Sequence, residues 1–164
     1  MSKKIFITGG TGFMGKHIIK KLIERGDSVF ILTRNPDKVK ALYGNESKVE
    51  AINSNEIKSP EQLSKVFEET DVIINLAGAN VGDKRWTKEY KEEIYNSRIE
   101  TTKLIVESIK LCKNKPELLI SASGVGIYGF CGEEKINEES DLGKDFLAKV
   151  CTDWENEAVK AEES

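Results

Sequence analysis

The chain has 164 residues, of which 38% are hydrophobic and 32% charged, and its 25 basic and 28 acidic side chains leave a net charge of −3. Such a chain can bury the core of one domain, and its balanced charge gives no reason to expect nucleic-acid binding. Its apolar runs are far shorter than the ~20 residues that a membrane-spanning helix needs, so no membrane association is expected. Three cysteines without C-x-x-C spacing favour a reduced, cytoplasmic location.

Apolar strand-like runs alternate with segments of helical periodicity along the chain, which is typical of a parallel α/β sheet. Strands are predicted at 3–8, 28–33, 49–52, 71–76 and 118–121, and helices at 12–25, 36–43, 60–69, 87–112 and 146–158. Right-handed crossovers then give an open, doubly wound Rossmann sheet with the strand order 3-2-1-4-5. Ligands of such sheets bind at the carboxyl ends of the strands, at the switch between the first and the fourth.

A glycine-rich loop follows the first predicted strand, with the spacing G-x-x-G-x-x-G at Gly9, Gly12 and Gly15. We expect Gly9 to allow a tight turn, Gly12 to let a pyrophosphate approach, and Gly15 to let helix and strand pack closely. The start of the helix adds unpaired N–H groups that favour an anion. The loop therefore predicts dinucleotide binding. The overlapping P-loop pattern fails, because His17 stands where a Mg²⁺ site requires Ser or Thr.

The end of the second predicted strand decides which dinucleotide is expected. An NAD site places an acidic side chain there, which accepts a hydrogen bond from the ribose 2′-hydroxyl. This strand ends instead in Thr33 and Arg34. An arginine can pair with a 2′-phosphate through its planar fork, and a threonine hydroxyl can donate to it. We therefore predict that NADP(H) is favoured over NAD(H).

Together with the glycine loop and the end of the second predicted strand, three further stretches show a family resemblance: 74–78, 84–98 and 121–129. The chain resembles the atypical or extended short-chain dehydrogenase/reductase superfamily, and within it the bacterial "epimerase family" of nucleoside-diphosphate-sugar epimerases. The resemblance implies a cofactor-binding set: Gly9, Thr11, Gly12, Phe13, Met14 and Gly15 around the pyrophosphate, Thr33 and Arg34 at the ribose phosphate, Asn75, Leu76, Ala77 and Gly78 beside the central region, and Ser121, Ala122 and Ser123 near the nicotinamide. An asparagine at position 75 can bond a ribose or fix a loop.

The Tyr-x-x-x-Lys pair that this superfamily typically uses for catalysis is missing. The resemblance places Leu147 at the tyrosine position and Cys151 at the lysine position, and no tyrosine follows Tyr128. Ser123 is the best counterpart of the superfamily's serine, ahead of Ser121. Tyr128 is a candidate substitute hydroxyl for acid/base catalysis, although a packed loop aromatic is the simpler interpretation.

The remaining polar residues leave two functions open. Arg85 and Arg98 could reach an anionic substrate, although surface salt bridges are the simpler interpretation, and the acidic stretch 133–139 is expected to be a solvated loop without a metal site. The first function is an NADP-dependent oxidoreductase or epimerase acting on a small polar or sugar-nucleotide substrate. The alternative is a regulatory or structural protein that binds a dinucleotide without chemistry.

The resemblance also bears on the domain organisation. Relatives continue beyond the helix that contains Trp154 with another strand and a C-terminal substrate lobe. We therefore expect residues 1–164 to form an NAD(P)-binding Rossmann domain without the later strands and without that lobe. The edge of the fifth strand should then expose apolar surface, through which two copies are expected to form a homodimer.

Overall fold

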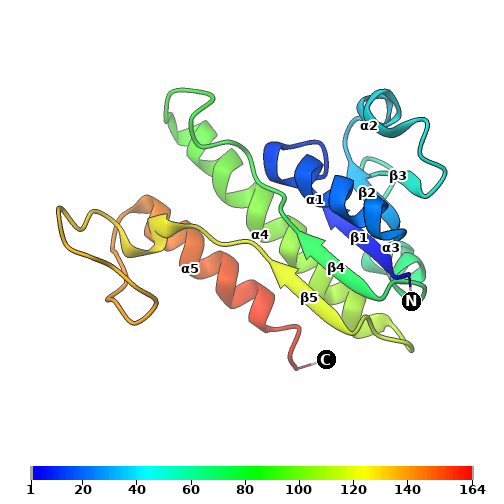
Figure 1. The fold of residues 1–164 in the computed structure, drawn as a ribbon. Coiled ribbons are helices and arrows are strands. Elements are labelled where there is room, and N and C mark those ends of the chain that lie inside the picture. Colours follow the sequence, from blue (N-terminus) through cyan, green and yellow to red (C-terminus); the bar gives the residue numbers. More distant parts are fainter. Residues whose placement is uncertain (1, 164) are drawn as a thin grey trace.

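The computed structural model describes residues 2–163, and its five strands form one parallel sheet (Figure 1). The predicted fold class and the strand order β3-β2-β1-β4-β5 are confirmed. The strands are β1 (Lys4–Thr8), β2 (Ser28–Thr33), β3 (Val49–Asn53), β4 (Val72–Asn75) and β5 (Leu118–Ser121). The helices are α1 (Phe13–Arg25), α2 (Pro36–Tyr43), α3 (Pro60–Phe67), α4 (Lys88–Leu111), the 3₁₀ helix η1 (Val125–Tyr128) and α5 (Phe146–Val159).

The central strand β1 is buried on both faces, because successive side chains of a strand point to opposite sides of the sheet. On one face Ile5 and Ile7 pack with Ile19 of α1. On the other face Phe6 packs edge-on against Phe67 of α3, with 4.8 Å between the ring centroids. The two apolar clusters clamp β1 in place, so the loop that follows it begins from a fixed point.

Side-chain caps mark where three of the described helices begin. Asn35, Thr87 and Asp145 each accept a hydrogen bond from a backbone N–H in the first turn of α2, α4 and α5. The N-cap of α1 is Gly12, which has no side chain to do this. The positive end of the α1 dipole is therefore left open at the carboxyl edge of the sheet.

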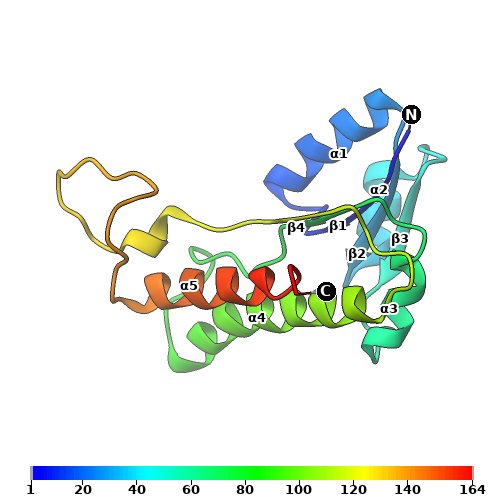
Figure 2. The same cartoon turned by 90° about the horizontal axis from the view of Figure 1, so that it is seen from below.

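Helices α4 and α5 run side by side beneath the sheet, and α5 lies next to the edge strand β5 (Figure 2). On the opposite face of the sheet, Leu118 and Ile120 of β5 are 50% and 46% exposed. The expected apolar surface at the fifth strand is thus present. Between residues 2 and 163, every helix is too short or too polar to cross a bilayer.

Candidate functional site

A groove of about 400 Å³ opens at the carboxyl ends of β1, β2 and β4, where the topology predicts a ligand. Most of the side chains and backbone segments expected at the cofactor line it. These are Gly9, Thr11, Gly12, Thr33, Arg34, Leu76, Ala77 and Gly78. The groove therefore joins three motifs that are far apart in the sequence. Phe13, Met14, Gly15, Asn75, Ser121, Ala122 and Ser123, which were also expected there, lie outside its lining.

The glycine loop has the backbone geometry that its spacing predicts. Gly9 has a φ of +68°, and a Cβ atom on it would lie 2.7 Å from the carbonyl oxygen of Leu76. A Cβ atom on Gly15 would lie 2.4 Å from the carbonyl oxygen of Gly9. The expected tight turn and the close packing of helix on strand are therefore confirmed, and neither position accommodates a side chain.

The first turn of α1 can reach the groove only with its backbone. The side chains of Phe13 and Met14 are 78% and 60% exposed and point to solvent. Gly12 lines the groove, and a Cβ atom there would make a tight contact of 3.1 Å with the carbonyl oxygen of Gly9. The local arrangement is an uncapped helix start with room for an anion next to it.

Small polar residues and one arginine form the end of the groove beside β2. The hydroxyl of Thr33 accepts a hydrogen bond from the backbone N–H of Asn35 at 3.1 Å, which shapes the turn into α2. Arg34 is exposed and lines the groove. Ser54, directly after β3, also lines it. Ser54 was not predicted from the sequence, because a serine after a weak strand matches no motif.

A buried hydrogen-bond network holds the turn after β4. The hydroxyl of Thr8 donates to Asn75 Oδ1 at 2.7 Å and accepts from the backbone N–H groups of Leu76 and Ala77, each at 3.0 Å. Asn75 is fully buried, and its Nδ2 donates to Thr102 Oγ1 at 2.8 Å. Of the two roles considered for this asparagine, its side chain has the geometry of the loop-fixing one. The amide is already hydrogen-bonded inside the protein, to Thr8, Thr102 and Ser121.

Helix α4 contributes to the groove in a way that the sequence did not reveal. Ser97 accepts a hydrogen bond from the backbone N–H of Ala79 at 2.9 Å, and both Ser97 and Thr101 line the groove. Arg98 donates to the carbonyl oxygen of Ala79 at 3.1 Å and is half-buried. The interpretation of Arg98 as a surface salt-bridging residue was wrong. The sequence alone does not show which face of α4 packs against the turn after β4, because that depends on the tertiary structure.

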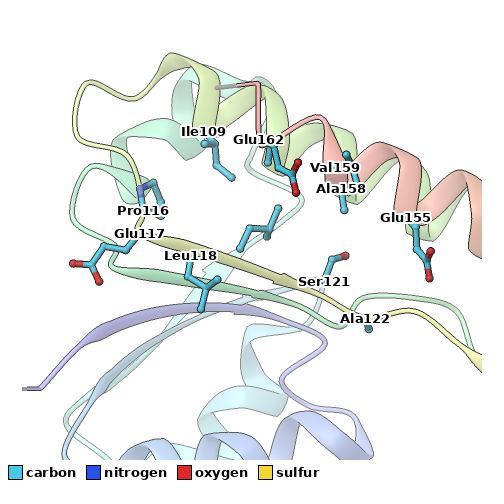
Figure 3. Close-up of a pocket in the computed structure, with 12 residues that line it drawn as sticks. Ile109, Pro116, Glu117, Leu118, Ser121, Ala122, Glu155, Ala158, Val159 and Glu162 are labelled. Atoms are coloured by element: carbon cyan, nitrogen blue, oxygen red, sulfur yellow. The ribbon is translucent and has the colours of Figure 1, made fainter. Parts of the chain in front are cut away.

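A second cavity of about 490 Å³ lies between the free edge of β5 and α5 (Figure 3). Ser121 and Ala122 line this cavity, opposite Glu155 and Ala158 of α5. Ser121 also accepts a hydrogen bond from Asn75 Nδ2 at 3.3 Å. The structure thus brings these two residues to the β5–α5 side of the sheet edge, next to the groove and not inside it.

The register of α5 agrees with the positions inferred for the missing catalytic pair. A Cβ atom on Gly126 would lie 3.2 Å from the Cβ of Leu147, and one on Gly124 would lie 3.6 Å from the Sγ of Cys151. Both α5 residues therefore face the loop that follows β5. Burial raises the pKa of the Cys151 thiol, while nearby Arg98 opposes that shift. Cys151 is buried, as is typical of a small core residue.

The two candidate catalytic hydroxyls have different surroundings. Ser123 is exposed, and its hydroxyl donates a hydrogen bond to the carboxylate of Glu155. Tyr128 is half-buried at the end of η1, where its carbonyl oxygen accepts from the thiol of Cys131 at 3.2 Å. Within the described part of the chain, no three His, Cys, Asp or Glu side chains are grouped to hold a metal ion.

The sequence of this chain is similar to those of known proteins. Residues 5–163 match the model of the NAD dependent epimerase/dehydratase family. The epimerase family protein YfhF of Bacillus subtilis is 38% identical over 159 residues, which are 96% of this chain and 50% of that protein. A chloroplastic SDR39U1 homolog of Arabidopsis thaliana is 31% identical, again over 96% of this chain but over 44% of that protein.

Two solved structures have the same fold and retain sequence similarity. Human epimerase family protein SDR39U1, determined with NADPH, gives a TM-score of 0.75 at 26% identity, covering 94% of this chain and 48% of that chain. A nucleoside-diphosphate sugar epimerase from Corynebacterium glutamicum gives a TM-score of 0.73 at 30% identity, covering 99% of this chain and 32% of that chain. This chain spans about half the length of the curated relatives it matches. Its sequence, sheet topology and glycine loop together show that it belongs to the NAD dependent epimerase/dehydratase family.

Proposed function

We propose that this chain binds NADP(H) in the groove and provides the cofactor-binding half of an oxidoreductase or epimerase that acts on a small polar or sugar-nucleotide substrate. One observation carries the proposal. The uncapped start of α1, which follows β1, and the exposed Arg34, which follows the neighbouring strand β2, line the same groove. A dinucleotide with a 2′-phosphate needs these two anion sites at once.

The residues fit the cofactor in a definite order. The backbone around Gly12 would receive the pyrophosphate, and Arg34 with Thr33 would receive the adenosine ribose and its 2′-phosphate. The turn at Ala77 and Gly78 would border the other half of the molecule. When bound, the nicotinamide accepts or delivers a hydride, and the protein supplies its position and the electrostatics around it. The structure of the human relative was determined with NADPH, which supports the choice of NADP(H).

The catalytic assignment rests on the hydroxyl groups in the loop that follows β5. We assign acid/base chemistry to Ser123, with Tyr128 as a second candidate, because apolar Leu147 and the buried Cys151 occupy the positions of the missing pair. Ser121 and Ala122 would lie on the nicotinamide side, beyond the end of β4. The carboxylate of Glu155 accepts the hydrogen bond of Ser123 and can take up its proton.

Cofactor binding is tested by fluorescence titration of the protein with NADPH and with NADH. We expect NADPH to bind about tenfold more tightly or better, since the phosphate adds a charge-assisted hydrogen bond. Equal or tighter binding of NADH would contradict the preference. Hydride transfer is then measured with a panel of sugar nucleotides and small carbonyl compounds. Binding without any transfer would favour a regulatory or structural dinucleotide-binding protein instead.

Two further points remain proposals. We propose that residues 1–164 form an NAD(P)-binding Rossmann domain and that a substrate lobe lies outside this chain, because the chain spans about half the length of its relatives. We also propose a cytoplasmic location. It rests on the cysteines Cys112, Cys131 and Cys151, which are all free thiols in the structure.

A further inference from the structure

The turn after β3 is fixed against the turn after β2, at one end of the groove. The two strands pair in parallel, with Thr33 opposite Asn53. Arg34 and Ser54 come directly after them, on neighbouring strands that are only about 4.8 Å apart. The backbone N–H of Ser54 donates to the carbonyl oxygen of Thr33 at 2.8 Å. The side-chain amide of Asn55 donates to the carbonyl oxygen of Arg34 at 3.3 Å, which ties the turns together once more.

The hydroxyl of Ser54 is available to a ligand in the groove. Ser54 is partly exposed and lines the groove together with Thr33 and Arg34. Its hydroxyl makes no hydrogen bond to any residue between 2 and 163, and no buried side-chain oxygen or nitrogen in that range lacks a partner. The hydroxyl is therefore in contact with solvent, on a residue that forms part of the groove wall.

The charges around Ser54 favour an anion. Arg34 is the only charged side chain among the lining residues that the structure describes, and no ion pair within 2–163 includes it. Glu56, two residues after Ser54, accepts a hydrogen bond from Asn53 Nδ2 at 2.8 Å and is not part of the lining. A phosphate at this end of the groove would thus meet a guanidinium and hydroxyl groups, and no lining carboxylate would repel it.

The hydroxyl of Thr33 is less available than its place at a strand end suggests. It donates to the carbonyl oxygen of Asn35 at 3.3 Å and accepts from the backbone N–H of the same residue at 3.1 Å. Its single proton is therefore used inside the turn. A phosphate presents three acceptor oxygens, and the fork of one arginine can pair with two of them. A further donor is needed for the third, and of these two hydroxyls that of Ser54 has the free proton.

Resting on the proposed function, we propose that Ser54 is a second specificity-determining residue for NADP(H). Its hydroxyl donates a hydrogen bond to the 2′-phosphate, whose other oxygens pair with Arg34. The hydroxyl of Thr33 keeps its hydrogen bonds to Asn35 and shapes the turn. The pairing of β2 with β3 brings the two phosphate ligands together, although they are 20 residues apart in the sequence. NAD(H), which lacks the phosphate, depends far less on Ser54.

The test is a fluorescence titration of variants with NADPH and NADH, which differ only in the 2′-phosphate. In Ser54→Ala we expect NADPH to bind about tenfold more weakly and NADH to stay within about threefold, because a hydrogen bond to a charged group is the stronger one. In Ser54→Asp we expect NADPH to bind about a hundredfold more weakly and NADH at least as tightly as before. The new carboxylate repels the phosphate but can accept from a ribose 2′-hydroxyl.

The matched control is Ser47→Asp, which makes the same charge change at an exposed serine before β3, at the amino end of the strand and away from the groove. It should leave both affinities within about twofold of the unaltered protein. If thermal unfolding shows that Ser54→Asp is not folded, Ser54→Ala decides.

The outcomes separate the inference from the proposed function. Equal weakening of NADPH and NADH in Ser54→Ala would place the hydroxyl at a part that both cofactors share, such as the adenine, and unchanged affinities would show no contact. Either result overturns the inference, while preferential binding of NADPH by the unaltered protein leaves the proposed function standing. If the unaltered protein does not bind NADPH, or binds NADH as tightly, the proposed choice of cofactor fails and the inference with it.

Discussion

The side-chain amide of Asn75 on β4 donates a hydrogen bond to the hydroxyl of Thr102 on α4, with 2.8 Å between Nδ2 and Oγ1. The same hydroxyl accepts from the indole N–H of Trp154 on α5 at 2.9 Å and donates to the carbonyl oxygen of Arg98. Thr102 is fully buried. One hydroxyl therefore joins a strand and two helices directly below the proposed cofactor turn.

Replacing Thr102 with valine should lower the free energy of unfolding by about 3 kcal/mol, because two buried N–H donors lose their acceptor. The matched variant is Thr102→Ser, which keeps the hydroxyl and loses only a methyl group. Urea denaturation of both variants measures the difference. If Thr102→Val and Thr102→Ser had the same free energy of unfolding, the hydrogen bonds to the Thr102 hydroxyl would not stabilise the fold.

Replacing Gly15 with alanine should weaken NADPH and NADH together by about tenfold or more, because the new Cβ would lie 2.4 Å from the carbonyl oxygen of Gly9 and displace the loop. Fluorescence titration with both cofactors measures the effect. Gly82→Ala serves as the control, since a Cβ there would meet only Asn80 Oδ1, at 3.6 Å. Unchanged affinity in Gly15→Ala would show that the loop does not hold the pyrophosphate.

Replacing Arg34 with alanine should weaken NADPH by about tenfold and leave NADH almost unchanged, because the guanidinium is proposed to contact only the 2′-phosphate. NADH is thus the internal control for the integrity of the groove. Raising the ionic strength should weaken NADPH in the unaltered protein more than in the variant. If Arg34→Ala weakened the binding of NADPH and NADH equally, Arg34 would support the conformation of the loop and would not contact the 2′-phosphate.

Asp27 should make the stability of the fold sensitive to acid. Burial of this carboxylate raises its pKa, but hydrogen bonds from the backbone N–H of Lys3 and from Arg25 outweigh burial, so its pKa lies below the ordinary value of 3.8. A lowered pKa stabilises the fold above that ordinary value, and the contribution is lost as the pH falls through the lowered one.

We expect Asp27→Asn to be less stable than the unaltered protein by about 1–2 kcal/mol at pH 7, with the gap closing toward about pH 3. Urea denaturation at a series of pH values follows both proteins. The control is Asp37→Asn, at an exposed carboxylate in α2, which is measured in parallel. A gap for Asp27→Asn that widened on acidification would contradict the assignment.

The uncovered face of β5 should promote self-association. Leu118 and Ile120 lie side by side on it, and replacing both with lysine should shift the chain toward monomer in sedimentation velocity over a range of concentrations. Leu42→Lys, at a comparably exposed leucine on α2, should have no effect. If the unaltered chain is monomeric at every concentration, the predicted homodimer is wrong.

Much of the architecture was predictable because its signals are local. Apolar runs and segments of helical periodicity predicted the order of strands and helices, and Gly26, the C-cap of α1, has a left-handed φ of +89°. Gly9 and Gly15 were predictable for the same reason, since turn geometry and close packing select glycine within a few residues of chain. Thr33 and Arg34 were predicted at the cofactor because they stand at the end of the second predicted strand.

The sequence by itself therefore determined the Rossmann fold, the glycine loop and the absence of a Tyr-x-x-x-Lys pair. Only the tertiary structure decided that Asn75 is turned inward, that Arg98 is half-buried with no acidic partner between residues 2 and 163, and that Ser121 and Ala122 face α5. The physical reason is that burial and hydrogen-bond partners come from distant segments. Asn75 and Trp154 meet at Thr102 from 27 and 52 residues away, distances over which no local pattern carries information.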